Sequence, residues 1–161
     1  MVCIMDEALE LEVGHRVLEI GAGSGWHAST IAEIVSPADA PKEEWGHVYT
    51  VERVPELAEF ARKNVERAGY GDRITVICGD GSLGCLEEAP YDRVLVTAAA
   101  PNIPAPLIDQ LRGGGVLVIP VGGVHFYQNL VRVRKKDGKI FEENLGGVAF
   151  VPLIGKHGFK P

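Results

Sequence analysis

Short apolar runs alternate with amphipathic helical segments along most of this chain. β-Branched and aliphatic residues predict five strands, at residues 16–20, 47–51, 74–78, 93–97 and 116–120. Helical spacing of apolar residues predicts helices at residues 1–11, 26–35, 55–68 and 104–111. Parallel strands need crossover connections and usually bury both faces of their sheet. The alternation therefore predicts an α/β fold with a doubly wound, mostly parallel sheet.

The C-terminal part departs from this alternation. Residues 129–134 and 139–145 flank a Lys-Asp-Gly turn, which predicts an antiparallel hairpin. Residues 149–154 are expected to form a last strand. Residues 36–46 carry two prolines and mixed charges, which indicates a surface loop inserted after the second helix.

Length and charge limit the possible classes of protein. The 161 residues suit one domain, residues 1–161, and the net charge of −6 supplies no basic field for nucleic acid or an anionic membrane. The apolar runs are shorter than the ~18 residues of a membrane helix. Cys3, Cys78 and Cys85 show no Cys-x-x-Cys spacing, and Cys78 in its apolar run is expected to be a buried thiol. A reducing cytoplasm fits this cysteine usage best.

A glycine-rich turn, residues 21–25, joins the first strand to the next helix. Glycines let a ligand approach the backbone, and the helix N-terminus offers free N–H groups. A tight turn alone needs fewer glycines, so ligand binding is favoured over a purely structural turn. Glu52, which ends the second strand, is placed to accept ribose hydroxyls. Asp80 ends the third strand beside Gly81 and could bind adenine, although both acids also fit ordinary solvated or Asx-turn positions.

The glycine spacing argues against a dinucleotide cofactor. Trp26 occupies the third-glycine position of the Gly-x-Gly-x-x-Gly pattern, and no Gly-Lys-Ser/Thr follows the turn. Glu19 precedes the first glycine and would lie beside a ligand cation, which favours a sulfonium or ammonium group over a pyrophosphate. S-adenosylmethionine carries both cations. A dinucleotide oxidoreductase stays the alternative.

No Ser–His–Asp, paired-carboxylate or metal-ligand pattern stands out in the sequence. The five histidines follow no ligand spacing and are expected at the surface or in turns; they are His15, His27, His47, His125 and His157.

Successive motifs of the chain resemble those of the protein-L-isoaspartate (D-aspartate) O-methyltransferase family. The similar stretches are residues 17–25 (VLEIGAGSG), 51–57 (VERVPEL), 79–84 (GDGSLG), 89–92 (APYD), 97–101 (TAAAP), 107–111 (LIDQL), 119–122 (IPVG) and 150–153 (FVPL). The resemblance implies a Rossmann-like class I methyltransferase. It implies methyl transfer from S-adenosylmethionine to the carboxylate of L-isoaspartyl residues in damaged proteins (EC 2.1.1.77, protein repair), with S-adenosylhomocysteine as the product.

The resemblance also assigns site residues. The residues expected around the cofactor are Glu19, Gly21, Gly23, Ser24, Gly25, Glu52, Arg53, Asp80 and Gly81. The residues expected near the acceptor are Thr97, Ala98, Ala99 and Pro101. The acceptor carboxylate has a reference pKa near 4 and is ionised at pH 7, so this reaction needs no general base.

One family motif is not found in the sequence. Members carry a Thr-Ile-Ser-Ala-Pro-His-Met stretch whose serine is regarded as the active-site residue, and Met1 aligns with its last methionine. This serine would precede Met1, so no catalytic residue is identified and weak or absent turnover of these 161 residues is expected. The alternatives are a non-catalytic S-adenosylmethionine-binding domain and a methyltransferase for another acceptor. A monomer is expected.

Overall fold

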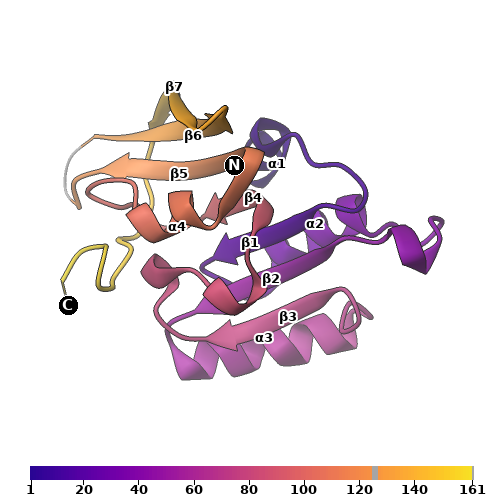
Figure 1. Cartoon of the computed structure of the whole chain (residues 1–161). Coiled ribbons are helices and arrows are strands. Elements are labelled where there is room, and N and C mark those ends of the chain that lie inside the picture. Colours follow the sequence, from indigo (N-terminus) through magenta and orange to yellow (C-terminus); the bar gives the residue numbers. More distant parts are fainter. Residues whose placement is uncertain (125–126, 161) are drawn as a thin grey trace.

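The computed structural model describes residues 1–124 and 127–160 (Figure 1). Its helices are α1 (Val2–Leu9), α2 (Trp26–Val35), α3 (Pro55–Arg67) and α4 (Ala105–Asp109). Its strands are β1 (Arg16–Ile20), β2 (His47–Glu52), β3 (Ile74–Cys78), β4 (Tyr91–Val96), β5 (Leu111–Gly122), β6 (Gln128–Lys136) and β7 (Lys139–Val148). Short 3₁₀ turns lie at Lys42–Glu44, Gly81–Leu83 and Leu86–Glu88. His125 lies outside the described residues.

All seven strands form one sheet in the order β3-β2-β1-β4-β5-β6-β7. The first five strands of this order pair in parallel, and β6 and β7 add an antiparallel hairpin at one edge. This confirms the α/β, doubly wound and mostly parallel fold with a C-terminal hairpin. β1 pairs with both β2 and β4, so the chain reverses its direction of winding at β1.

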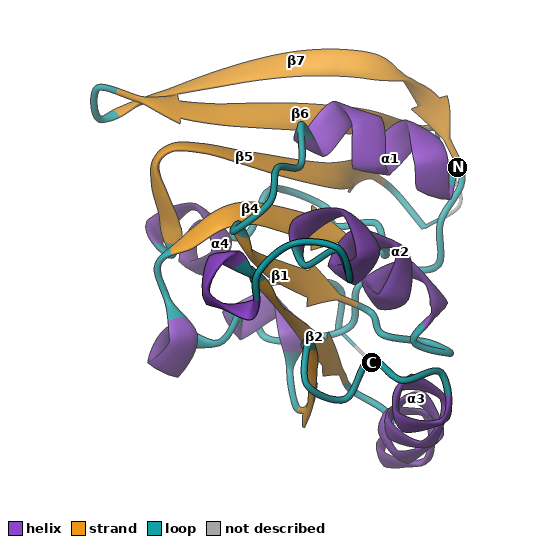
Figure 2. Ribbon diagram, turned by 90° about the vertical axis from the view of Figure 1, so that its right-hand side faces the viewer, coloured by secondary structure: helices purple, strands orange, loops and turns teal. Residues whose placement is uncertain are grey.

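Two apolar cores lie on opposite faces of the sheet. Figure 2 shows α1, α2 and α3 on one side and α4 on the other. Val17 of β1 packs in the core that contains Leu9 and Ile31 of the first two helices. Leu18, the next residue, packs in the other core with Leu107 of α4. Successive side chains of a strand point to opposite faces, so β1 contributes to both cores.

The structure corrects the expected boundaries of β5. The strand starts at Leu111 and includes residues 113–115, the three glycines that were expected to precede it. Leu111 is buried and pairs with Tyr91, and the register shifts before Arg93 pairs with Val116. A bulge on β5 therefore accommodates the glycines, and α4 ends earlier than expected.

The expected last strand, residues 149–154, is wrong. This segment forms only isolated parallel bridges, between Ala99 and Pro152 and between Ile154 and Phe159. Proline has no N–H and cannot continue a hydrogen-bonded ladder. The expected burial of Cys78 is also wrong, because this last residue of the edge strand β3 is exposed.

No helix in the described part of the chain is long and apolar enough to cross a membrane. Within the same residues, no group of three or more His, Cys, Asp or Glu side chains is arranged to hold a metal ion.

Gly46 is a position where the fold tolerates no side chain. Its amide donates to the Val35 carbonyl, and a Cβ atom there would lie 2.1 Å from the His15 carbonyl oxygen. We expect Gly46→Ala to lower the free energy of unfolding by roughly 1–3 kcal/mol, the usual cost of overpacking. The measurement is urea denaturation followed by circular dichroism.

Gly113→Ala is the matched control, because a Cβ atom on exposed Gly113 meets nothing within 4 Å. It should change the free energy of unfolding by less than about 0.5 kcal/mol. Equal losses in the two variants would contradict the packing argument.

Candidate functional site

The three glycines of the turn after β1 serve different purposes. A Cβ atom on Gly21 would lie 2.4 Å from the Thr97 hydroxyl oxygen, and one on Gly25 would lie 3.0 Å from Val65. These two glycines are required by packing and by their positive φ angles of 99° and 82°. Gly23 also has a positive φ, 53°, but a Cβ atom there would meet nothing within 4 Å. Gly23 therefore faces open space, where a ligand can approach the backbone.

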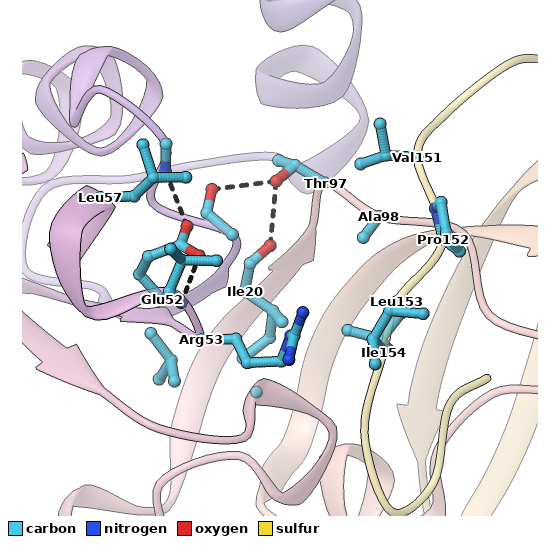
Figure 3. Close-up of a pocket in the computed structure, with 15 residues that line it drawn as sticks. Ile20, Glu52, Arg53, Leu57, Thr97, Ala98, Val151, Pro152, Leu153 and Ile154 are labelled. Atoms are coloured by element: carbon cyan, nitrogen blue, oxygen red, sulfur yellow. Dashed lines mark hydrogen bonds between the residues drawn. The ribbon is translucent and has the colours of Figure 1, made fainter. Parts of the chain in front are cut away.

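A cavity of about 370 Å³ opens at this turn. Figure 3 shows its walls, with Val151 and Leu153 on one side and Glu52 and Leu57 on the other. Its lining residues are Ile20, Gly21, Gly23, Val51, Glu52, Arg53, Val54, Leu57, Gly81, Thr97, Ala98 and Val151, Pro152, Leu153 and Ile154. The volume lies within the roughly 300–1,000 Å³ range of small-molecule sites. The cavity also lies at the carboxyl edge of the sheet where the winding reverses, the usual ligand position of such folds.

Glu52 is the acidic group that faces this cavity. The residue is only 8% exposed, and its carboxylate accepts hydrogen bonds from the Gly23 amide, at 3.1 Å, and the Val54 amide, at 3.0 Å. It thereby ties the glycine turn to the start of α3. Each carboxylate oxygen keeps a second lone pair, so Glu52 can still accept hydroxyl protons from a ligand.

The residues expected near the acceptor divide into two pairs. Thr97 and Ala98 line the cavity, and the Thr97 hydroxyl lies 3.0 Å from the carbonyl oxygens of both Ile20 and Gly21. Ala99 and Pro101 are not among the lining residues. Ala99 is buried and pairs through its backbone with the C-terminal segment, whereas Pro101 is exposed.

Glu19 does not line the cavity. It is fully buried on the face of β1 opposite to Ile20, towards α1 and α2, because strand side chains alternate. One carboxylate oxygen accepts a 2.5 Å hydrogen bond from the Thr50 hydroxyl, and the other has no partner among the described residues. Burial raises the pKa of Glu19 to about 7. Glu19 was expected beside a ligand, but it lies in the layer beneath the glycine turn.

His27 is another departure from expectation. It is buried in the first turn of α2, and its Nε2 lies 2.7 Å from an Asp6 carboxylate oxygen. The other Asp6 oxygen accepts a hydrogen bond from Thr30. Asp6 and His27 belong to segments that are separate in the sequence, so no local pattern indicates their contact.

The other residues expected at the cofactor lie in three places. Gly81 lines the cavity, and a Cβ atom there would lie 2.3 Å from Ile20. Exposed Arg53 also lines it. Ser24 and Gly25 instead line a separate groove between α2 and α3. Asp80 points away, and its carboxylate accepts hydrogen bonds from Ser82 and from the Lys156 amide.

Sequence reasoning did not assign Leu57 or residues 151–154 to the site. The FVPL stretch, residues 150–153, contributes to the family resemblance, but nothing in its apolar pattern indicates a cavity wall. The contact depends on the C-terminal segment returning to the end of β4, where Val151 and Leu153 hydrogen-bond to Ala99.

The raised pKa of Glu19 predicts a pH-dependent stability. The folded protein holds a proton on Glu19 up to about pH 7, whereas the unfolded chain releases it near pH 4.5. Raising the pH through this window therefore lowers the free energy of unfolding, by up to roughly 3 kcal/mol. Glu19→Gln lacks this titration, so we expect its stability relative to the wild type to rise from pH 5 to pH 8. Urea denaturation at both pH values measures the difference.

Glu43→Gln, at an exposed position in the loop before β2, is the control and should show no such trend. A Glu19→Gln difference that stays constant between the two pH values would show that Glu19 is ionised in the folded protein.

Comparisons with known proteins agree with this geometry. A family model described as protein-L-isoaspartate (D-aspartate) O-methyltransferase (PCMT) matches residues 1–158. The chain is 58% identical over 160 residues to a protein-L-isoaspartate O-methyltransferase of Hyperthermus butylicus, covering 99% of this chain and 66% of that relative. It is 57% identical over 161 residues to one of Thermococcus onnurineus, with 99% and 69% coverage. The chain thus spans about two thirds of the length of these relatives.

Solved structures give the same result. One described as a protein-L-isoaspartate O-methyltransferase superposes with a TM-score of 0.86 at 31% identity, covering 98% of this chain and 47% of the other. A Plasmodium falciparum structure described as the same enzyme, in complex with S-adenosyl-L-homocysteine, gives a TM-score of 0.80 at 27% identity, with 95% and 71% coverage. The chain therefore belongs to the protein-L-isoaspartate (D-aspartate) O-methyltransferase family.

Proposed function

We propose that this chain binds S-adenosylmethionine in the cavity beside Gly23 and transfers its methyl group to the carboxylate of L-isoaspartyl residues in proteins. The observation that carries the proposal is the position of Glu52. Its nearly buried carboxylate faces a cavity at the carboxyl edge of the sheet, next to Gly23, where a Cβ atom would meet nothing within 4 Å. The family of the chain supplies the reaction type.

The cavity suits an adenosine group without phosphates. Glu52 has lone pairs for two ribose hydroxyls, and the apolar side chains of Ile20 and Val51 offer surfaces for a flat ring. Gly81 leaves room for the Ile20 side chain, which lines the same cavity. Arg53 is the cation among the lining residues, and it lies at the exposed rim. We assign the cofactor to Gly21, Gly23, Glu52, Arg53 and Gly81 and the acceptor to Thr97 and Ala98.

The protein would act by positioning and by excluding water. When bound, S-adenosylmethionine supplies an activated methyl group whose bond to sulfur breaks as a carboxylate oxygen attacks, which leaves neutral S-adenosylhomocysteine. The acceptor carboxylate has a reference pKa near 4 and is ionised at pH 7, so no side chain has to remove a proton. The Thr97 hydroxyl points to the backbone of the glycine turn and fixes β4 against it. Val151 and Leu153 give the cavity an apolar wall, from which bound ligands would displace water.

We also propose the substrates, the oligomeric state and the cellular location of this protein. The substrates are proteins or peptides that contain L-isoaspartyl residues. The net charge of −6 and the cysteine usage support a monomer in the cytoplasm that binds neither nucleic acid nor membranes. Residues 1–161 would act as one domain, which the single seven-stranded sheet supports.

Cofactor binding tests the role of Glu52. Glu52→Gln replaces one accepting oxygen by an amide donor, which cannot accept from a ribose hydroxyl or from a backbone N–H. We expect the dissociation constant for S-adenosylhomocysteine, measured by isothermal titration calorimetry, to rise roughly tenfold to a hundredfold. Glu56→Gln, on the exposed first turn of α3, is the control and should bind like the wild type. Unchanged binding by Glu52→Gln would place the cofactor elsewhere.

The acceptor is tested by methyl transfer. Labelled S-adenosylmethionine is incubated with the protein and either an L-isoaspartyl peptide or the same sequence with a normal aspartate. We expect label in the isoaspartyl peptide alone, because only there does the carboxylate extend from the α-position of the peptide backbone. Binding of S-adenosylhomocysteine without transfer would favour a non-catalytic binding domain or another acceptor. Tight NADH binding without S-adenosylhomocysteine binding would overturn the choice of cofactor.

A further inference from the structure

The C-terminal segment forms one wall of the cavity and is held near the ends of two strands (Figure 3). At the end of β4, the Ala99 amide donates to the Val151 carbonyl at 2.8 Å, and the Leu153 amide donates to the Ala99 carbonyl at 2.7 Å. Figure 3 shows the segment that carries Val151 and Leu153 facing Glu52 across the cavity. This first anchor places an apolar wall beside Thr97 and Ala98, the residues assigned to the acceptor.

A second anchor lies at the end of β3. The Lys156 amide donates to an Asp80 carboxylate oxygen at 2.8 Å, and the His157 amide donates to the Ser82 hydroxyl at 3.0 Å. The Ser82 hydroxyl and amide both donate to the other Asp80 oxygen, at 2.7 and 2.9 Å. Although burial alone would raise the pKa of Asp80, these hydrogen bonds lower it. Asp80 is therefore an ionised carboxylate with a backbone donor on each oxygen and a hydroxyl donor on one of them.

The second anchor is tightly packed. Ser82 is fully buried, and a Cβ atom on Gly155 would lie 2.1 Å from an Asp80 oxygen and 2.6 Å from the Ser82 oxygen. Two further bonds close the loop on itself, from the Phe159 amide to Leu153 and from the Gly155 amide to Phe159. In this conformation of the loop, the Lys156 amide reaches Asp80 and the His157 amide reaches Ser82.

We propose that Asp80 and Ser82 are positioning residues that latch the C-terminal segment along one side of the cavity and so hold the wall beside the acceptor. This latch consists of Asp80, Ser82, Gly155, Lys156 and His157, and its role in catalysis rests on the proposed function. Neither Asp80 nor Ser82 lines the cavity. Their action on the acceptor is indirect, through the position of residues 151–154.

The latch assigns Asp80 a role different from adenine binding. Hydrogen bonds to an ionised carboxylate are stronger than those between neutral groups, which makes Asp80 suitable for fixing a loop without secondary structure. Without the latch, the wall keeps its backbone bonds to Ala99 and the buried Leu153 side chain, whereas Val151 is already 69% exposed. Loss of the latch should therefore disturb the acceptor side more than the cofactor side.

Two variants open the latch from opposite sides. Gly155→Ala inserts a methyl group against Asp80 and Ser82, and Ser82→Ala removes the hydroxyl that binds the His157 amide. Gly147→Ala is the matched control, because a Cβ atom there meets nothing within 4 Å. Circular dichroism establishes that each variant is folded, and the smaller change in Ser82→Ala serves if Gly155→Ala fails to fold.

Hydrogen exchange tests the latch without any turnover. In the unliganded protein, we expect the amides of Lys156 and His157 to exchange at least about tenfold faster in both latch variants than in wild type and control. Exchange at the wild-type rate would overturn the proposal. Because this measurement needs neither cofactor nor acceptor, it stays decisive even if methyl transfer to isoaspartyl peptides is not observed.

Kinetics test the consequence for the acceptor. We expect the latch variants to raise the KM for an isoaspartyl peptide at least about fivefold, with kcat and the dissociation constant of S-adenosylhomocysteine within about twofold of wild type. Asp80→Asn should behave in the same way. A higher dissociation constant for S-adenosylhomocysteine with an unchanged peptide KM would instead assign Asp80 to the adenine and contradict the latch.

Discussion

The pairing of β1 with strands on both of its sides is the constraint on which the rest of this structure depends. Because β2 and β4 both pair with β1 in parallel, every crossover has to pass over a face of the sheet. β1 is thereby buried on both faces, and the connections that leave β1 and β4 diverge at its carboxyl end. The cavity beside Gly23 lies where these connections separate.

Two carboxylates then hold the loops around this cavity. Glu52 binds the amides of Gly23 and Val54, whereas Asp80 binds the amides of Ser82 and Lys156. Glu52 is the last residue of β2 and Asp80 lies two residues after β3, and both bind irregular backbone that no strand ladder stabilises. They differ in orientation, since Glu52 faces the cavity and Asp80 faces the C-terminal loop. Acidic residues near the ends of neighbouring strands can thus face a ligand cavity or hold a loop in place.

Glu19 shows how the pKa of a carboxyl group changes with its surroundings. Placed beneath the turn, it has Thr50 as its one hydrogen-bond partner among the described residues, and its neighbours include the side chains of Asp6, His27 and Glu52. Burial without a full set of donors favours the neutral acid, which is why its pKa rises. The residue contributes to the layer between β1 and the helices, where ionisation is unfavourable.

The sequence by itself determined the elements whose signals are local. The apolar run of β1 and the helical spacing of α2 predict the observed boundaries, and the glycine turn between them indicates the ligand site, because periodicity and missing Cβ atoms are properties of neighbouring residues. Only the tertiary structure decided that Glu19 faces the helices, that Cys78 is exposed and that residues 151–154 form a cavity wall. These outcomes depend on which distant segment packs against each residue. The neighbouring residues in the sequence do not indicate that contact.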